Sequence, residues 1–234
     1  MSNSPTTAVL IPGMGNTPLL WQAQRASLID DFDLILPDYR GSSSIEEMAD
    51  NVVASMPDSP VALVGFSLGG YIALDIVRRY PERLQQLIFI SSSPYADSEA
   101  AIAQRRKLIA NSHNDYSKLL EDMGKGITYP KGPNVIEARQ RLLEMGLDLG
   151  AEEFRRQQEA TMRRKDNREL LPTIKIPTRV LCGDKDFVTP LAGNQLIAEQ
   201  IPGATISIIE NSGHLLPLEQ PQQVSAFLRE SLSS

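Results

Sequence analysis

The stretch Gly65-Phe66-Ser67-Leu68-Gly69-Gly70 decides the fold of this chain. An apolar run, 61–64, precedes it, and a segment with helical periodicity, 71–77, follows it. A strand that turns abruptly into a helix through Gly-x-Ser-x-Gly holds its serine at the apex of a strained turn, because the flanking glycines carry no Cβ that would clash. The pattern favours a nucleophile elbow, with Ser67 as the reactive group, over a glycine-rich turn with a capping serine.

Strand-like and helix-like segments alternate along much of the chain. Alternation of this kind is typical of a parallel sheet covered by helices on both faces. We therefore predict an α/β protein with a mostly parallel sheet of about six strands. The expected strands are Ala8–Ile11, Phe32–Leu36, Val61–Val64, Leu87–Ile90, Arg179–Cys182 and Thr205–Ile209, and the expected helices cover about 44–56, 68–80, 190–200 and 220–232.

The alternation stops between about Tyr95 and Leu171, where three or four helical stretches follow one another. A helical block inserted between two strands of a parallel sheet predicts a lid over the carboxyl ends of the strands, where such sheets bind ligands. We expect residues 1–94 and 172–234 to form the α/β core and residues 95–171 to form the lid.

Length and charge limit the classes of function. A chain of 234 residues suits one sizeable α/β domain, and its net charge of −6 argues against nucleic acid or an anionic membrane as partner. Cys182, the single cysteine, lies in an apolar run and is interpreted as a core residue. Because no leader-like segment and no apolar run long enough to span a membrane occurs, we expect a cytoplasmic protein.

A serine nucleophile needs a base, and the sequence offers two histidines. His113 lies in a polar stretch of the expected lid, whereas His214 follows an expected strand, where α/β enzymes place catalytic groups. A carboxylate must orient the imidazole, and Asp186, after the strand ending at Cys182, is placed for that role. Its rivals are Asp184 in the same loop and, more distantly, Asp97. The expected triad is Ser67, Asp186 and His214.

The oxyanion of an acyl-transfer reaction needs two backbone N–H donors. One is expected from Leu68, directly after the nucleophile. The other is assigned to Met14, in the glycine-containing loop 12–16 after the first strand. The apolar side chains expected to contact the substrate are Trp21, Phe66, Met123, Met145, Phe187 and Leu215, although such residues often belong to the core.

With these motifs, the chain resembles the α/β-hydrolase superfamily from Ala8 to Leu232. The resemblance also covers residues 37–41, 80–83, 183–186 and 213–221, and it is closest to small bacterial carboxylesterase-like proteins such as pimeloyl-carrier-protein methyl esterases and 3-oxoadipate enol-lactonases. Two features depart from common patterns. Pro12-Gly13 stands where many relatives have His-Gly, and Tyr71 stands where relatives that perform an elimination in menaquinone synthesis carry arginine. The chain also begins at the strand before the oxyanion loop, so we expect no antiparallel strands ahead of it.

These patterns predict a serine hydrolase that cleaves a carboxylic ester or thioester through an acyl-enzyme. A small-molecule substrate is expected, with an acyl-carrier protein as an optional partner. No cofactor or metal is expected, because the histidines lie far apart and no metal-ligand motif occurs. The alternatives are a C–C hydrolase, lyase or haloperoxidase-like activity on the same triad, and a non-enzymatic ligand sensor that retains it.

Overall fold

A parallel sheet of six strands, in the order β2-β1-β3-β4-β5-β6, forms the centre of the protein. The computed structural model describes residues 5–233; residues 1–4 and 234, at the ends of the expected core, lie outside the described residues. Neighbouring strands are parallel throughout the sheet. The strands are β1 (Thr7–Ile11), β2 (Asp33–Ile35), β3 (Val61–Phe66), β4 (Leu84–Ile90), β5 (Thr178–Gly183) and β6 (Thr205–Ile209).

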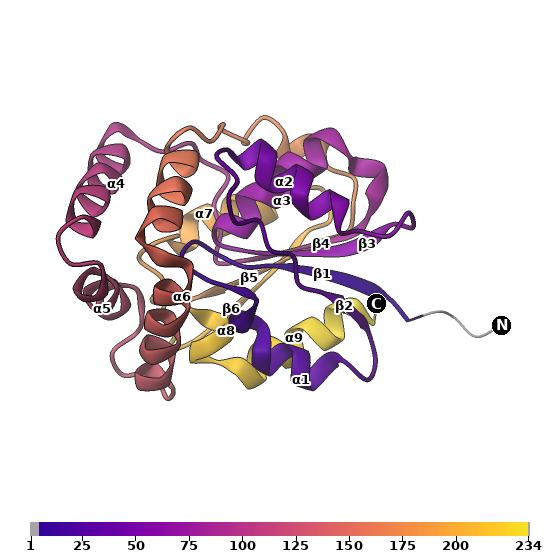
Figure 1. Ribbon diagram of the computed structural model, residues 1–234. Helices are drawn as coiled ribbons and strands as arrows, with labels where there is room; N and C mark the ends of the chain where they lie inside the picture. Colours follow the sequence, from indigo (N-terminus) through magenta and orange to yellow (C-terminus); the bar gives the residue numbers. More distant parts are fainter. Residues whose placement is uncertain (1–4, 234) are drawn as a thin grey trace.

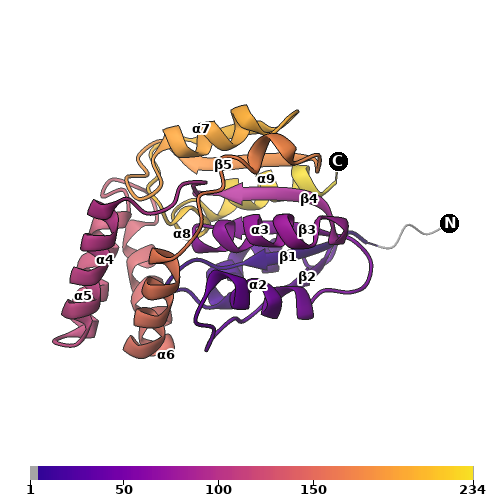
Figure 2. The ribbon, with the colours of Figure 1, turned by 90° about the horizontal axis from the view of Figure 1, so that it is seen from above.

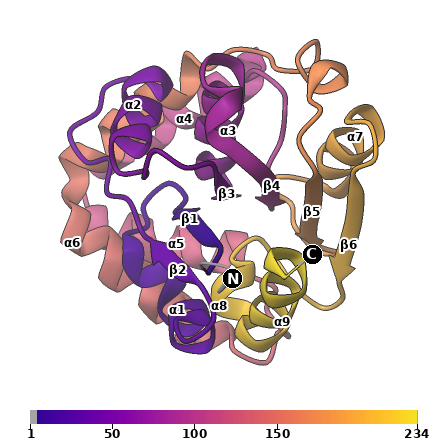
Figure 3. The same ribbon diagram turned by 90° about the vertical axis from the view of Figure 1, so that its right-hand side faces the viewer.

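Helices cover both faces of the sheet, as Figure 3 shows from one end. One layer contains α2 (Ile45–Ala54), α3 (Leu68–Arg79) and α7 (Leu191–Gln200). The opposite layer contains α1 (Gln22–Leu28), α8 (Leu216–Glu219) and α9 (Pro221–Leu232). The predicted fold class, including the number of strands, is therefore confirmed.

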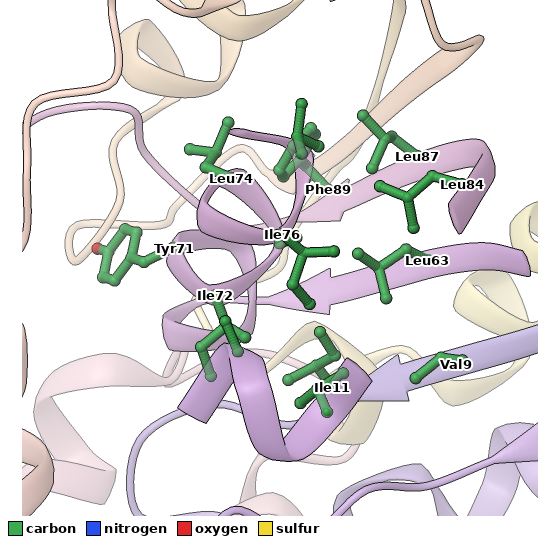
Figure 4. Close-up of a cluster of buried hydrophobic side chains, with 14 of the residues drawn as sticks. Val9, Ile11, Leu63, Tyr71, Ile72, Leu74, Ile76, Leu84, Leu87 and Phe89 are labelled. Carbon is green, nitrogen blue, oxygen red and sulfur yellow. The ribbon is translucent and has the colours of Figure 1, made fainter. Parts of the chain in front are cut away.

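Successive side chains of the central strands point to opposite faces of the sheet and pack into two separate hydrophobic clusters. Val9 and Ile11 pack with α3 in one cluster, whereas Ala8 and Leu10 belong to the cluster on the opposite face. Figure 4 shows the first of these clusters, in which Ile72 and Ile76 of α3 pack with side chains of β1 and β3 such as Ile11 and Leu63. Burial on both faces explains why these strands appear in the sequence as continuous apolar runs.

Three helices are inserted between β4 and β5: α4 (Glu99–Ser112), α5 (Tyr116–Ile127) and α6 (Val135–Met162). Figures 1 and 2 show them beside the end of the sheet toward which the strand arrows point. Gly150, with φ of +81°, interrupts α6, so the insert has the three or four helical stretches expected. Its position fits the predicted lid, and its role as a lid stays a prediction.

The helix α1 has no counterpart among the sequence-based expectations. It is short, and three of its seven residues are Gln or Arg, so its apolar periodicity is weak. Its stability comes from packing against α9 and from the Gln24 amide, which donates to the carbonyl of Pro217 at 3.1 Å. Across residues 5–233, no helix combines the length and apolar character that crossing a bilayer requires.

Candidate active site

Ser67 occupies a sharp turn between β3 and α3. Its φ of +52° and ψ of −112° lie in a region that non-glycine residues rarely adopt. The turn depends on close backbone approaches: a Cβ on Gly65 would lie 2.6 Å from the carbonyl oxygen of Gly69, and one on Gly69 would lie 2.5 Å from that of Ile11. The sequence therefore places glycine where α3 begins against the ends of β1 and β3.

The structure brings Ser67 together with His214 and Asp186. The Nε2 atom of His214 lies 2.9 Å from the Ser67 Oγ atom, and its Nδ1 atom lies 2.9 Å from Oδ2 of Asp186. Asp186 follows β5 and His214 follows β6, so three loops at the carboxyl edge of the sheet supply the three side chains. This is the arrangement in which an imidazole can accept the serine proton while the carboxylate fixes its tautomer.

Asp186 is held as a carboxylate by hydrogen bonds in a buried position. The Thr189 hydroxyl donates to its Oδ2 at 2.7 Å, and the backbone N–H groups of Val188 and Thr189 donate to its Oδ1 at 2.9 Å. Burial raises the pKa of the Asp186 carboxyl, but the charge and hydrogen bond of His214 and these Thr189 donors outweigh it and lower the pKa below its usual value. The anionic form that can stabilise an imidazolium is thus favoured.

The rival groups have other partners. Asp184 accepts the backbone N–H of Ser212 at 3.2 Å and pairs with Lys185. Asp97 pairs with Arg105 and Arg164. His113 is exposed where α4 ends.

Glu219, which sequence reasoning did not single out, fixes the loop that carries His214. Its buried carboxylate accepts the backbone N–H groups of Gly213, Leu215 and Tyr129 at 2.9, 3.0 and 2.9 Å. Burial raises the pKa of the Glu219 carboxyl above its usual value, although the three N–H donors partly counteract this effect. The residue thereby joins the His214 loop to the segment after α5. The only signal in the sequence was that Glu219 lies in the segment 213–221, which carries part of the resemblance to the superfamily.

Hydrogen bonds from two other parts of the chain hold the loop that is expected to bind the oxyanion. The Tyr39 hydroxyl donates to the carbonyl of Pro12 at 3.0 Å, and the backbone N–H of Gly15 donates to Oε1 of Gln157 in α6 at 2.9 Å. Met14 lies between these anchors and lines the same cavity as Leu68. As the first residue of α3, Leu68 has a backbone N–H with no acceptor inside its own helix.

A cavity of about 940 Å³ opens in front of Ser67 and His214. Phe66, Met123 and Leu215, three of the apolar residues expected to contact the substrate, line it. Trp21, Met145 and Phe187 do not. Trp21 packs edge-on against Phe66, behind the wall, with a centroid separation of 6.4 Å, and Met145 is buried in the core, whereas the Phe187 side chain is 81% exposed to solvent.

Comparisons with known proteins agree with the fold. The model of a family described as "Alpha/beta hydrolase family" matches residues 8–227. RutD of Yersinia enterocolitica, a candidate carbamate hydrolase, is 26% identical, with 97% of this chain and 87% of RutD covered. A pimeloyl-[acyl-carrier protein] methyl ester esterase of Neisseria meningitidis is 24% identical, with 97% of this chain and 82% of the esterase covered. Among solved structures, a thermophilic esterase from Thermogutta terrifontis, determined with malate bound, superposes with a TM-score of 0.90 at 29% identity, covering 99% of this chain and 90% of the esterase.

The chain belongs to the alpha/beta hydrolase family. The predicted family and the prediction of a hydrolase are confirmed, and the similar proteins include esterases. Within residues 5–233, no three His, Cys, Asp or Glu side chains gather in a way that could hold a metal ion.

Proposed function

We propose that the protein hydrolyses carboxylic esters or thioesters of small to medium acyl groups through an acyl-enzyme on Ser67. The observation that carries this proposal is the continuous chain of hydrogen bonds from Ser67 through His214 to Asp186. Ser67 and His214 line a cavity that can hold a substrate. The cavity's size suits a small-molecule substrate. The family membership and the esterases among the similar proteins support the same reaction class.

In the proposed reaction, the Ser67 Oγ atom attacks the ester carbonyl while His214 Nε2 takes its proton. His214 then gives this proton to the leaving alcohol or thiol, and a water molecule, activated by the same nitrogen, attacks the acyl-enzyme. Asp186 stabilises the imidazolium in both steps. The backbone N–H groups of Met14 and Leu68 donate to the oxyanion, a contact worth about 3 kcal/mol per donor in related chemistry.

Turnover of p-nitrophenyl acetate and butyrate tests the proposal. We expect sustained release by the parent and a loss of at least about a thousandfold in kcat for Ser67→Ala and His214→Ala. A fluorophosphonate probe should label the parent at Ser67, with labelling suppressed in His214→Ala. The matched control is His113→Ala, whose imidazole is exposed outside the cavity and whose loss should leave both readouts unchanged. Turnover that persists in folded Ser67→Ala would contradict the proposal.

The same experiment addresses a ligand sensor that retains the triad. A sensor should release one equivalent of p-nitrophenol and then retain the product, whereas the proposed enzyme should turn over repeatedly. A panel of pantetheine thioesters beside oxygen esters of equal acyl length then compares the two leaving groups. The Neisseria relative is named for the methyl ester that it cleaves, an oxygen ester, on an acyl group bound to a carrier protein.

A further inference from the structure

Two arginines in the wall of the cavity share one carboxylate. Arg105 of α4 and Arg164, just after α6, both bind Asp97: Nε of Arg105 lies 2.5 Å from Oδ2, and Nη1 of Arg164 lies 2.5 Å from Oδ1. All three residues line the cavity. The Asp97 side chain is 3% exposed, so these arginines are what neutralises it. Two guanidinium charges against one carboxylate leave one positive charge in excess.

The other charged side chains that line the cavity are Lys118, Asp115 and Asp122, which together carry one negative charge, and they lie apart from the Asp97 cluster. Lys118 pairs with Asp122 at 2.7 Å, and both side chains are more than half exposed. Asp115 caps α5 by accepting the backbone N–H of Lys118 at 2.9 Å. These groups lie on α5 or at its start, whereas the Asp97 cluster is built from α4 and the segments that flank α4 and α6. The excess positive charge is therefore local.

Arg105 also retains donors for a ligand. Its Nη1 atom donates to Oε1 of Gln158 at 2.7 Å and contacts the Met14 sulfur at 3.8 Å. Among residues 5–233, no protein acceptor bonds the Nη2 atom of Arg105, and the side chain is 20% exposed where it lines the cavity. Arg164 is more constrained, with its guanidinium 4.3 Å above the centre of the Tyr71 ring. Arg105 is thus a pre-oriented guanidinium with one nitrogen, Nη2, available to donate to a ligand.

Met14 connects this cluster to the reaction centre. Its sulfur touches Arg105, while its backbone N–H is the donor that we assign to the oxyanion. A group bound at Arg105 would therefore share one cavity with an ester at Ser67, with the Met14 side chain beside it. This arrangement suits a substrate with a charged end and a reacting ester in one molecule.

We propose that Arg105, supported by Arg164, binds a carboxylate carried by the ester substrate itself. The inference rests on the proposed esterase function and specifies its substrate class. A charged N–H donor such as Nη2 of Arg105 suits a carboxylate oxygen, and a single excess positive charge matches a monoanion better than a phosphate dianion. The carboxylate belongs either to the acyl part, as in the monomethyl ester of a dicarboxylic acid, or to the alcohol part, as in an acylated hydroxy acid.

Paired substrates test this proposal. One arm compares kcat/KM for monomethyl glutarate with that for dimethyl glutarate, and the other compares acetoxyacetate with its methyl ester. We expect the parent to prefer the anion in one arm. Arg105→Gln should lower that charged-to-neutral ratio by about tenfold or more, the usual worth of a hydrogen bond to a charged group, and Arg105→Lys should lower it less. In both variants Arg164 still pairs with Asp97.

The matched control is Arg106→Gln, which removes an exposed arginine next in sequence and outside the cavity; its ratio should equal that of the parent. Calorimetry measures glutarate binding to Ser67→Ala and to the Ser67→Ala/Arg105→Gln double variant, neither of which turns over substrate. The added Arg105→Gln substitution should weaken binding about tenfold. An unchanged ratio and unchanged glutarate binding in folded Arg105→Gln would overturn the inference, because the arginines would then only tie α4 to α6. Absence of any Ser67-dependent ester turnover in the parent would instead refute the proposed function.

Discussion

At the scale of single residues, the geometry of the site depends on glycines, because a Cβ atom at these positions would clash with neighbouring backbone. Gly69 allows α3 to begin directly against the end of β1, from which the loop carrying Met14 departs. The nucleophile and the proposed oxyanion loop are therefore positioned by one backbone contact. Any side chain at residue 69 would separate them.

We expect Gly69→Ala to be destabilising and to impair catalysis. Its Cβ would lie 2.5 Å from the Ile11 carbonyl oxygen and 2.9 Å from that of Pro12, so the backbone must move. Overpacking of this kind costs about 1–3 kcal/mol, and kcat should fall with it. Urea unfolding and p-nitrophenyl butyrate turnover measure the two effects. The control for stability is Gly126→Ala in α5, where a Cβ meets nothing within 4 Å and helix propensity should add about 0.5–1 kcal/mol. Wild-type stability in Gly69→Ala would contradict this account.

The lowered pKa of Asp186 predicts how stability responds to acid. The folded pKa lies below the unfolded value of about 3.9, so the unfolded state binds more protons between the two values and stability rises with pH there. The contribution is complete above about pH 5 and is lost as pH falls through the folded pKa. Asp186→Asn should lack this component, so its free energy of unfolding should depend less on pH between about pH 5 and 3. Equal acid sensitivity of the two proteins in urea titrations would refute the expectation.

At the scale of elements, α6 reaches from the insert to the oxyanion loop. Gln157 is 1% exposed, accepts the Gly15 N–H and donates through Nε2 to Glu153 at 3.2 Å. Glu153 in turn accepts the N–H of Gly41, in the loop after β2, at 3.1 Å. One face of α6 thus holds two loops of the core at the edge of the sheet where the site lies.

We expect Gln157→Leu to reduce kcat of ester turnover about tenfold with little change in KM. The substitution keeps the volume of the side chain but leaves the Gly15 N–H unpaired, at a cost of about 1–3 kcal/mol, and loosens the loop that carries Met14. The control is Glu152→Gln on the same helix, where the side chain is 81% exposed and no change is expected. A lower melting temperature with unchanged kcat would show that Gln157 only stabilises the fold.

Sequence patterns predict elements better than they predict pocket walls. Ser67, Asp186 and His214 each follow an apolar strand, and the carboxyl ends of parallel strands meet at one edge, so their proximity could be anticipated. The apolar lining could not, because Met123 and Met145 are both on inserted helices and only tertiary packing turns one toward the cavity and the other into the core. Gln157 has no local motif at all, since its partner is 142 residues away.

At the scale of the whole molecule, the sheet order explains why distant segments form one site. The strand β3, which leads to Ser67, lies between β1, which leads to Met14, and β4. The strands β5 and β6, which lead to Asp186 and His214, continue the sheet on the far side of β4. His214 must therefore reach back across two strand positions, and the Glu219 carboxylate holds its loop in the required path. The site exists only when the sheet is complete.

The reactivity of Cys182 can measure how far the active site depends on an intact sheet. This residue lies in β5 between β4 and β6, is fully buried, and has a pKa raised to about 12, mainly by burial. An unfolded cysteine has a pKa of about 8.5, so at pH 8 the native thiol should react with Ellman's reagent at least about a thousandfold more slowly than the chain in urea. Labelling in intermediate urea should then follow global unfolding and coincide with loss of esterase activity, because the same sheet holds the thiol and the triad. Cys182→Ser provides the blank. Rapid labelling of active, native protein would show instead that β6 opens alone and that the His214 loop does not depend on its pairing with β5.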